Sequence, residues 1–162
     1  MESENRAQQG RDEPIRALVV DDNPDIARLM AELLGKVTDV DVVAIAIGGE
    51  PGLELAITCQ VDLVLTDMDM PGTSGLRLAS LLRKRLPKIC IIITSGHDDS
   101  WAKPAVAAGA DSFISKSHLV EKLPEEIARL RKKGVLGTRT KGLKGDHELH
   151  NCLGGRRPHP RQ

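Results

Sequence analysis

Five short apolar runs recur along this chain, and each has the length and the β-branched content of a buried strand. Continuous apolar runs of this kind are typical of strands in a parallel sheet that is covered on both faces. The segments between them must then supply the covering helices. The runs are Ile15–Val20, Val40–Ile47, Val61–Asp67, Ile89–Ile93 and Ser112–Ser115.

Helical patterns alternate with these runs. Asn23 is a predicted N-cap, with Pro24 at the first helical position and a stop near Gly35. Alternating strands and helices predict βαβ units with right-handed crossovers, and therefore a parallel sheet with helices on both faces. The four later helices are predicted to run from about Gly52 to Cys59, from Ser74 as cap to just before Pro87, from Ser100 as cap with Pro104 in the first turn, and from near Pro124 to Gly134.

Four of the five runs end in side chains that phosphate chemistry can use. The first run is followed by Asp21 and Asp22, the third ends in Asp67, the fourth is followed by Thr94, and the fifth by Lys116. Ligands of open α/β sheets bind outside the carboxyl ends of the strands. We therefore expect these side chains to form one site.

A carboxylate can accept a phosphoryl group, but an anionic donor approaching three carboxylates is repelled unless a cation is present. Mg²⁺ prefers carboxylate, carbonyl, phosphate and water oxygens. We expect Asp22 and Asp67 to bind Mg²⁺ directly, Asp21 to act mainly through water, and Asp69 to offer its backbone carbonyl. Lys116 would then add a mobile positive charge next to the phosphoryl oxygens.

Charge and composition set the predicted boundaries. The 162 residues suffice for one domain with a core, and their net charge is zero. Residues 1–14 are acidic and expected to be disordered, 15–132 form the predicted domain, and 133–162 form a basic tail that is also expected to be disordered. No apolar run has the length of a membrane span and no secretory signal is visible, so a cytoplasmic protein without membrane contact is expected.

The motifs in this order resemble the receiver domain of bacterial two-component response regulators, over residues 15–132. The resemblance implies a flavodoxin-like, doubly wound, five-stranded parallel sheet of order 2-1-3-4-5 with five helices in three α/β/α layers, as in the chemotaxis regulator. The family usually has Pro after the Lys, whereas Ser117 stands here, so no cis bond is expected. The matching motifs are Asp21-Asp22-Asn23-Pro24, Asp67 with Met70-Pro71-Gly72, Thr94-Ser95, and Gly109-Ala110-Asp111 before Lys116.

The resemblance also implies roles for the site residues. Asp67 is expected to receive the phosphoryl group from a sensor histidine kinase or a phosphotransfer protein, with Thr94 as switch hydroxyl and Phe113 as aromatic switch. The aspartyl phosphate would change the face made by helix four, strand five and helix five, which is also the surface for an expected homodimer or for a downstream partner that controls transcription. Such a protein is no enzyme beyond its own phosphorylation and dephosphorylation.

Two alternatives remain open on the sequence. Asp67 and Asp69 also resemble the nucleophile and acid of haloacid-dehalogenase-type phosphatases, although Pro71 and the early acidic pair do not fit that motif. A receiver-like interaction module that is never phosphorylated is the second alternative. No sequence-specific DNA binding is expected, because the tail is too short for a helix-turn-helix domain.

Overall fold

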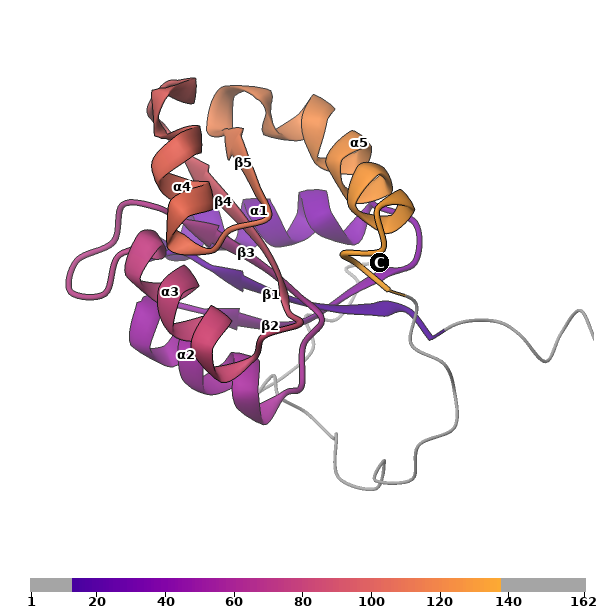
Figure 1. Ribbon diagram of the computed structural model, residues 1–162, viewed down its shortest axis with the longest axis horizontal. Coiled ribbons are helices and arrows are strands. Elements are labelled where there is room, and N and C mark those ends of the chain that lie inside the picture. The colour runs from indigo at the N-terminus through magenta and orange to yellow at the C-terminus, as the bar shows by residue number, and fades with distance from the viewer. Residues whose placement is uncertain (1–12, 138–162) are drawn as a thin grey trace, which may run out of the picture.

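The computed structural model describes residues 13–137, and Figure 1 shows a twisted sheet between two helical layers. All strand pairs are parallel and the order is β2-β1-β3-β4-β5, which confirms the predicted fold class. The segments predicted to be disordered, 1–14 and 133–162, lie mostly outside the described residues. Within the described part of the second segment, Leu136 is buried against the core, because its N–H and that of Val135 donate to the Leu130 carbonyl at the end of α5. The elements are β1 (Ile15–Val20), α1 (Pro24–Gly35), β2 (Val40–Ala46), α2 (Gly49–Thr58), β3 (Leu63–Asp67), α3 (Gly75–Arg85), β4 (Cys90–Ser95), α4 (Ala102–Ala108), β5 (Ser112–Ser115) and α5 (Leu119–Lys132).

Alternating side chains of the strands divide the core into two halves. Ala17 and Val19 of β1 pack on the side of α1 and α5, whereas Leu18 and Val20 pack on the side of α2, α3 and α4. Strands β3 and β4 alternate in the same way and are buried along their whole length. Because both faces are covered, the carboxyl ends of the strands are where a ligand can reach the sheet.

Local sequence signals set two of the helix starts as predicted. The side-chain oxygen of Asn23 accepts hydrogen bonds from the backbone N–H groups of Asp25 and Ile26 at the start of α1. The hydroxyl of Ser74 accepts one from the N–H of Arg77 at the start of α3. These caps satisfy N–H groups that have no partner inside the helix.

The other three helix starts differ from the prediction. Helix α2 begins at Gly49, three residues before the expected start at Gly52. Ser100 is not the cap of α4, because the Asp98 carboxylate already accepts from the Ser100 N–H and opens a 3₁₀ turn (Asp99–Trp101) ahead of the helix. A short side chain that accepts hydrogen bonds close to its own backbone competes well with a cap two residues later.

Helix α5 begins at Leu119, so Pro124 lies inside the helix and does not mark its start. A proline there removes one intrahelical hydrogen bond. The helix persists because one face of it is buried at the sheet, and burial of large aliphatic side chains outweighs the loss of one such bond. The buried residues are Leu119, Leu123, Ile127 and Leu130.

Arg83 near the end of α3 ties this helix to the start of β4 and to the turn before β5. Its guanidinium donates to the carbonyls of Pro87 at 2.9 Å, Ile89 at 2.8 Å and Gly109 at 2.7 Å. It also pairs with the Asp111 carboxylate at 2.8 Å, which in turn accepts from a backbone N–H of β4. Arg83 thereby fixes the end of the sheet opposite the polar strand ends.

Candidate functional site

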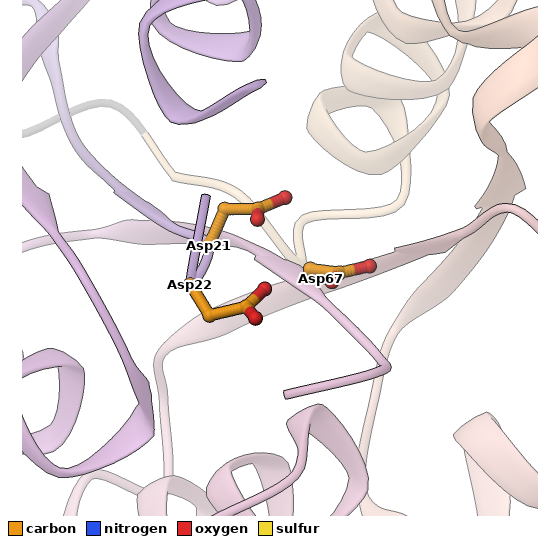
Figure 2. Close-up of side chains that lie close together, drawn as sticks. All are labelled: Asp21, Asp22 and Asp67. Atoms are coloured by element: carbon orange, nitrogen blue, oxygen red, sulfur yellow. The ribbon is translucent and has the colours of Figure 1, made fainter. Parts of the chain in front are cut away.

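Three carboxylates meet where β1 and β3 end. Val20 pairs with Thr66 across these strands, so the residues that follow β1 lie beside Asp67. Asp21, Asp22 and Asp67 each place an oxygen within 4.8 Å of the others. Figure 2 shows the three side chains side by side. Asp21 and Asp67 are buried, with exposed fractions of 1% and 4%, whereas Asp22 is exposed. The structure thus brings together the three carboxylates that the sequence predicted.

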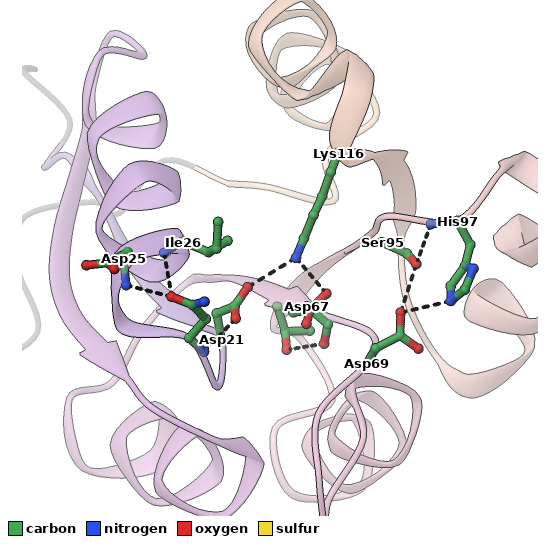
Figure 3. A network of polar contacts seen from close by, with 10 residues as sticks. Asp21, Asp25, Ile26, Asp67, Asp69, Ser95, His97 and Lys116 are labelled. Carbon is green, nitrogen blue, oxygen red and sulfur yellow. Dashed lines mark hydrogen bonds and ion pairs between the residues drawn. The ribbon is translucent and has the colours of Figure 1, made fainter.

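Lys116 reaches this cluster from the end of β5 (Figure 3). Its Nζ lies 3.2 Å from Asp67 Oδ1 and 3.4 Å from Asp21 Oδ2. Burial raises the pKa of Asp67, and the neighbouring Lys116 offsets this only in part. Burial alone would lower the pKa of Lys116, but attraction to Asp67 and Asp21 outweighs it and the pKa is raised. Lys116 therefore stays charged beside a carboxylate that is costly to ionise.

The cluster fits a hard divalent cation. Asp67 Oδ1 is buried and has no hydrogen-bond donor of good geometry within the described part of the chain. Its contact with Lys116 is an ion pair. One lysine does not neutralise three carboxylates, and buried carboxylate oxygens of this kind are usual ligands of Mg²⁺. Asp21, Asp22 and Asp67 are the residues that would hold the ion. The role of the Asp69 carbonyl stays a prediction.

Thr94 lies directly across the sheet from the central carboxylate. Its Cα pairs with that of Asp67, and the N–H of Met68 donates to the Thr94 carbonyl at 2.8 Å. The side chain is fully buried, and its hydroxyl has no hydrogen-bond partner among residues 13–137. Phe113 pairs with Ile93 and is only half-buried, packed against the α2–α4 side of the core. Among the described residues, therefore, the Thr94 hydroxyl has room for one more hydrogen bond and the Phe113 ring has surface left to bury.

Two features of the site have no clear signal in the sequence. The first is a contact between Asp69, just after the central carboxylate, and the side chains of Ser95 and His97. The second is Gly75, the first residue of α3, where an added Cβ would lie 2.1 Å from the carbonyl oxygen of Asp67. Both depend on how separate segments meet. No peptide bond of the described residues is cis, so Ser117 follows Lys116 in trans, as expected.

Comparison with known proteins decides the family. The model of the response regulator receiver domain matches residues 17–128. The chain belongs to the response regulator receiver family. Its fold and its carboxylate cluster are therefore those of a domain that serves two-component signalling. The phosphatase alternative, which rested on Asp67 and Asp69, is not favoured.

Two curated relatives give the sequence similarity. The nitrate/nitrite response regulator protein NarL of Escherichia coli strain K12 is 31% identical over 127 residues, covering 77% of this chain and 56% of NarL. The transcriptional regulatory protein LiaR of Bacillus subtilis strain 168 is 32% identical over 115 residues, covering 70% of this chain and 54% of LiaR. The chain spans about half the length of these relatives.

Solved receiver domains give the structural similarity. The REC domain of AraT, a response regulator from Geobacillus stearothermophilus, superposes with a TM-score of 0.65 at 31% identity, covering 74% of this chain and 94% of that domain. The response regulator domain of Thermotoga maritima CheB superposes with a TM-score of 0.64 at 25% identity, covering 75% of this chain and 96% of that domain.

Among the residues described here, no helix is both long and apolar enough to cross a membrane.

Proposed function

We propose that Asp67 is the phosphoryl acceptor of this receiver domain and that Asp21, Asp22 and Asp67 hold Mg²⁺. The observation that carries the proposal is the position of Asp67, buried at the end of β3 with an oxygen within 4.8 Å of two further carboxylates. Lys116 stands 3.2 Å away from the same side chain. A buried carboxylate with this surplus of negative charge fits a cation-dependent reaction better than a structural role.

In the proposed reaction a carboxylate oxygen of Asp67 attacks the phosphorus atom of the donor. The new oxygen–phosphorus bond makes Asp67 an acyl phosphate. The bond from phosphorus to the donor breaks, and its electron pair goes to the leaving group. When the donor is a phosphohistidine, the imidazole nitrogen leaves and takes a proton from water. Bound Mg²⁺ would neutralise charge on the phosphoryl oxygens and the carboxylates. Lys116 would orient the same oxygens through its mobile ammonium group.

The signal would pass from Asp67 through Thr94 to the face made by α4, β5 and α5. The Thr94 hydroxyl, which has no hydrogen-bond partner in the described part of the chain, lies across the sheet from Asp67 and can donate to a phosphoryl oxygen. Movement of Thr94 would open space next to its strand neighbour Ile93, on which Phe113 is paired. Phe113 is half-buried and would then turn inward. We propose this face as the surface for a downstream partner or a second copy of the chain.

The donor is proposed to be a sensor histidine kinase or a phosphotransfer protein, and the setting to be the cytoplasm. These are proposals for the whole protein, because the chain spans about half of its curated relatives. We likewise propose signalling and not substrate turnover as the role of this domain. No sequence-specific contact with DNA is proposed for residues 13–137.

Acetyl phosphate with Mg²⁺ tests the acceptor directly. Intact-mass spectrometry should show one acid-labile phosphoryl adduct on the wild type and none on Asp67→Asn. An Asp99→Asn variant, which removes an exposed carboxylate beyond β4, is the matched control and should be labelled like the wild type. Absence of an adduct on the wild type would refute the proposal and favour the non-phosphorylated module. Steady release of phosphate from simple phosphomonoesters would favour the phosphatase.

A further inference from the structure

A carboxylate just beyond the acceptor is held by two side chains from the end of β4. Asp69 Oδ2 accepts a hydrogen bond from Ser95 Oγ at 3.2 Å, and His97 Nε2 lies 3.3 Å from the same oxygen. Figure 3 shows Asp69 directed toward Ser95 and His97, whereas Asp67 is directed toward Lys116. The Asp69 and Asp67 carboxylates thus contact different partners although only Met68 separates them in the sequence.

The segment that provides these partners is itself fixed by the sheet. The N–H of His97 donates to Ser95 Oγ at 3.1 Å, and the carbonyl of His97 accepts from Ser115 Oγ of β5 at 3.4 Å. The His97 ring lies 6.2 Å from the Trp101 ring, measured between centroids. Ser95 is fully buried. The backbone of His97 is therefore fixed by Ser95 and Ser115, independently of Asp69.

The charge of Asp69 is what makes its direction important. Strand β3 ends at Asp67, and Asp69 follows only two residues later, beyond a bend at Met68, so its backbone lies next to the carboxylate site. The group of carboxylates within 4.8 Å nevertheless contains only Asp21, Asp22 and Asp67 among the described residues. A fourth carboxylate in that group would bind a cation more tightly and would repel an anionic phosphoryl donor.

We propose that Ser95 and His97 are positioning residues that hold the Asp69 carboxylate out of the metal and phosphoryl site. This inference rests on the proposed function, because it concerns the same Mg²⁺ and the same acceptor. Asp69 and His97 side chains are more than half exposed, at 55% and 57%. Exposed pairs contribute weakly, so the expected changes are small multiples and not a loss of activity.

The test makes two measurements. Titration calorimetry gives the Mg²⁺ affinity, and intact-mass spectrometry gives the initial rate of labelling by acetyl phosphate. His97→Ala frees Asp69, and it should tighten Mg²⁺ binding by about two- to fivefold while slowing labelling by about two- to fivefold. His97→Gln keeps an N–H donor and should stay within about twofold of the wild type in both measurements. Structural damage to the site would instead weaken Mg²⁺ binding.

The Asp69→Asn background separates positioning from any other effect of His97. There, His97→Ala should change neither Mg²⁺ affinity nor labelling rate, because no fourth carboxylate remains. Asp41→Asn removes one exposed charge near the start of β2, away from the site, and should leave the effect of His97→Ala intact. Unchanged or weaker Mg²⁺ binding in His97→Ala, or the same shifts in the Asp69→Asn background, would overturn the inference. A wild type that neither binds Mg²⁺ nor accepts the phosphoryl group would instead overturn the proposed function.

Discussion

Gly75 is the point at which α3 touches the acceptor residue, and Gly75→Ala should damage the site more than the fold. The Gly75 N–H donates to the Met68 carbonyl at 2.9 Å, which draws the start of α3 against the end of β3. An added Cβ would lie 2.1 Å from the Asp67 carbonyl oxygen and 2.8 Å from Met68 Cα. Both obstacles are backbone, so no side-chain rotation can relieve the clash.

The size of the effect follows from these distances. To restore an ordinary contact of 3.4 Å, the helix start and the Asp67 backbone must move apart by about 1.3 Å. Overpacking of this kind costs about 1–3 kcal/mol of unfolding free energy, or a fall in melting temperature of about 3–12 °C. Displacement of a reacting group by about 1 Å can cost about 100-fold in rate. The labelling rate should therefore fall far more than stability does.

The assay compares acetyl phosphate labelling of Asp67 with urea denaturation of the same samples. Gly35→Ala is the matched control, because an added Cβ at the end of α1 meets nothing within 4 Å. It should be labelled like the wild type and be equally stable or slightly more stable. Wild-type labelling by folded Gly75→Ala would refute the reasoning, since it would mean that α3 can shift without moving Asp67.

Three further predictions concern stability. Burial raises the pKa of Asp67, so its charge costs folding free energy as the pH rises above its ordinary pKa of 3.8. Without divalent cations, urea denaturation at pH 7 should show Asp67→Asn to be more stable than the wild type. A difference in unfolding free energy that failed to disappear in acid would contradict this cause. Thr94→Val replaces a buried hydroxyl that has no partner in the described structure, and it should raise the unfolding free energy by about 1 kcal/mol; a loss would reveal a partner for that hydroxyl. Arg83→Lys keeps the charge, but a lysine cannot reach three carbonyls and Asp111 at once. Calorimetry should show a loss of about 1–3 kcal/mol of unfolding free energy. An unchanged melting temperature would show that these hydrogen bonds contribute little.

The sheet was predictable because its signals are local. An aliphatic run such as Ile15–Val20 reads as a buried strand whatever surrounds it, and Asn23 or Ser74 caps a helix through its own neighbouring N–H groups. Helix starts failed where a tertiary contact decided them. A proline such as Pro124 normally lies in the first turn of a helix, but α5 already begins at Leu119, because Leu119 belongs to the buried face of the helix.

The site was predictable to the extent that it follows strand ends. Parallel strands bring their carboxyl ends to one edge, so Asp67 and Lys116 had to approach once the strand order was known. The partners of Asp69 had no such rule. His97 and Ser95 contact Asp69 because the loop after β4 folds back over the loop after β3, and nothing in their sequence spacing encodes that contact. Roles within the site, including the Asp69 carbonyl, stay predictions.

Two residues assigned a signalling role from the sequence, like Arg131, carry a buried polar atom with no hydrogen-bond partner among residues 13–137. Asp67 has a buried oxygen without an aligned donor, and Thr94 has a buried hydroxyl without a partner within residues 13–137. A buried polar group without a hydrogen-bond partner costs stability, and for Asp67 the ion pair with Lys116 offsets part of that cost. Mg²⁺ at the carboxylates and a phosphoryl oxygen at the hydroxyl would remove both costs. The free energy so released is available to shift the α4–β5–α5 face, because a ligand changes a conformational equilibrium only through its different affinity for the two states.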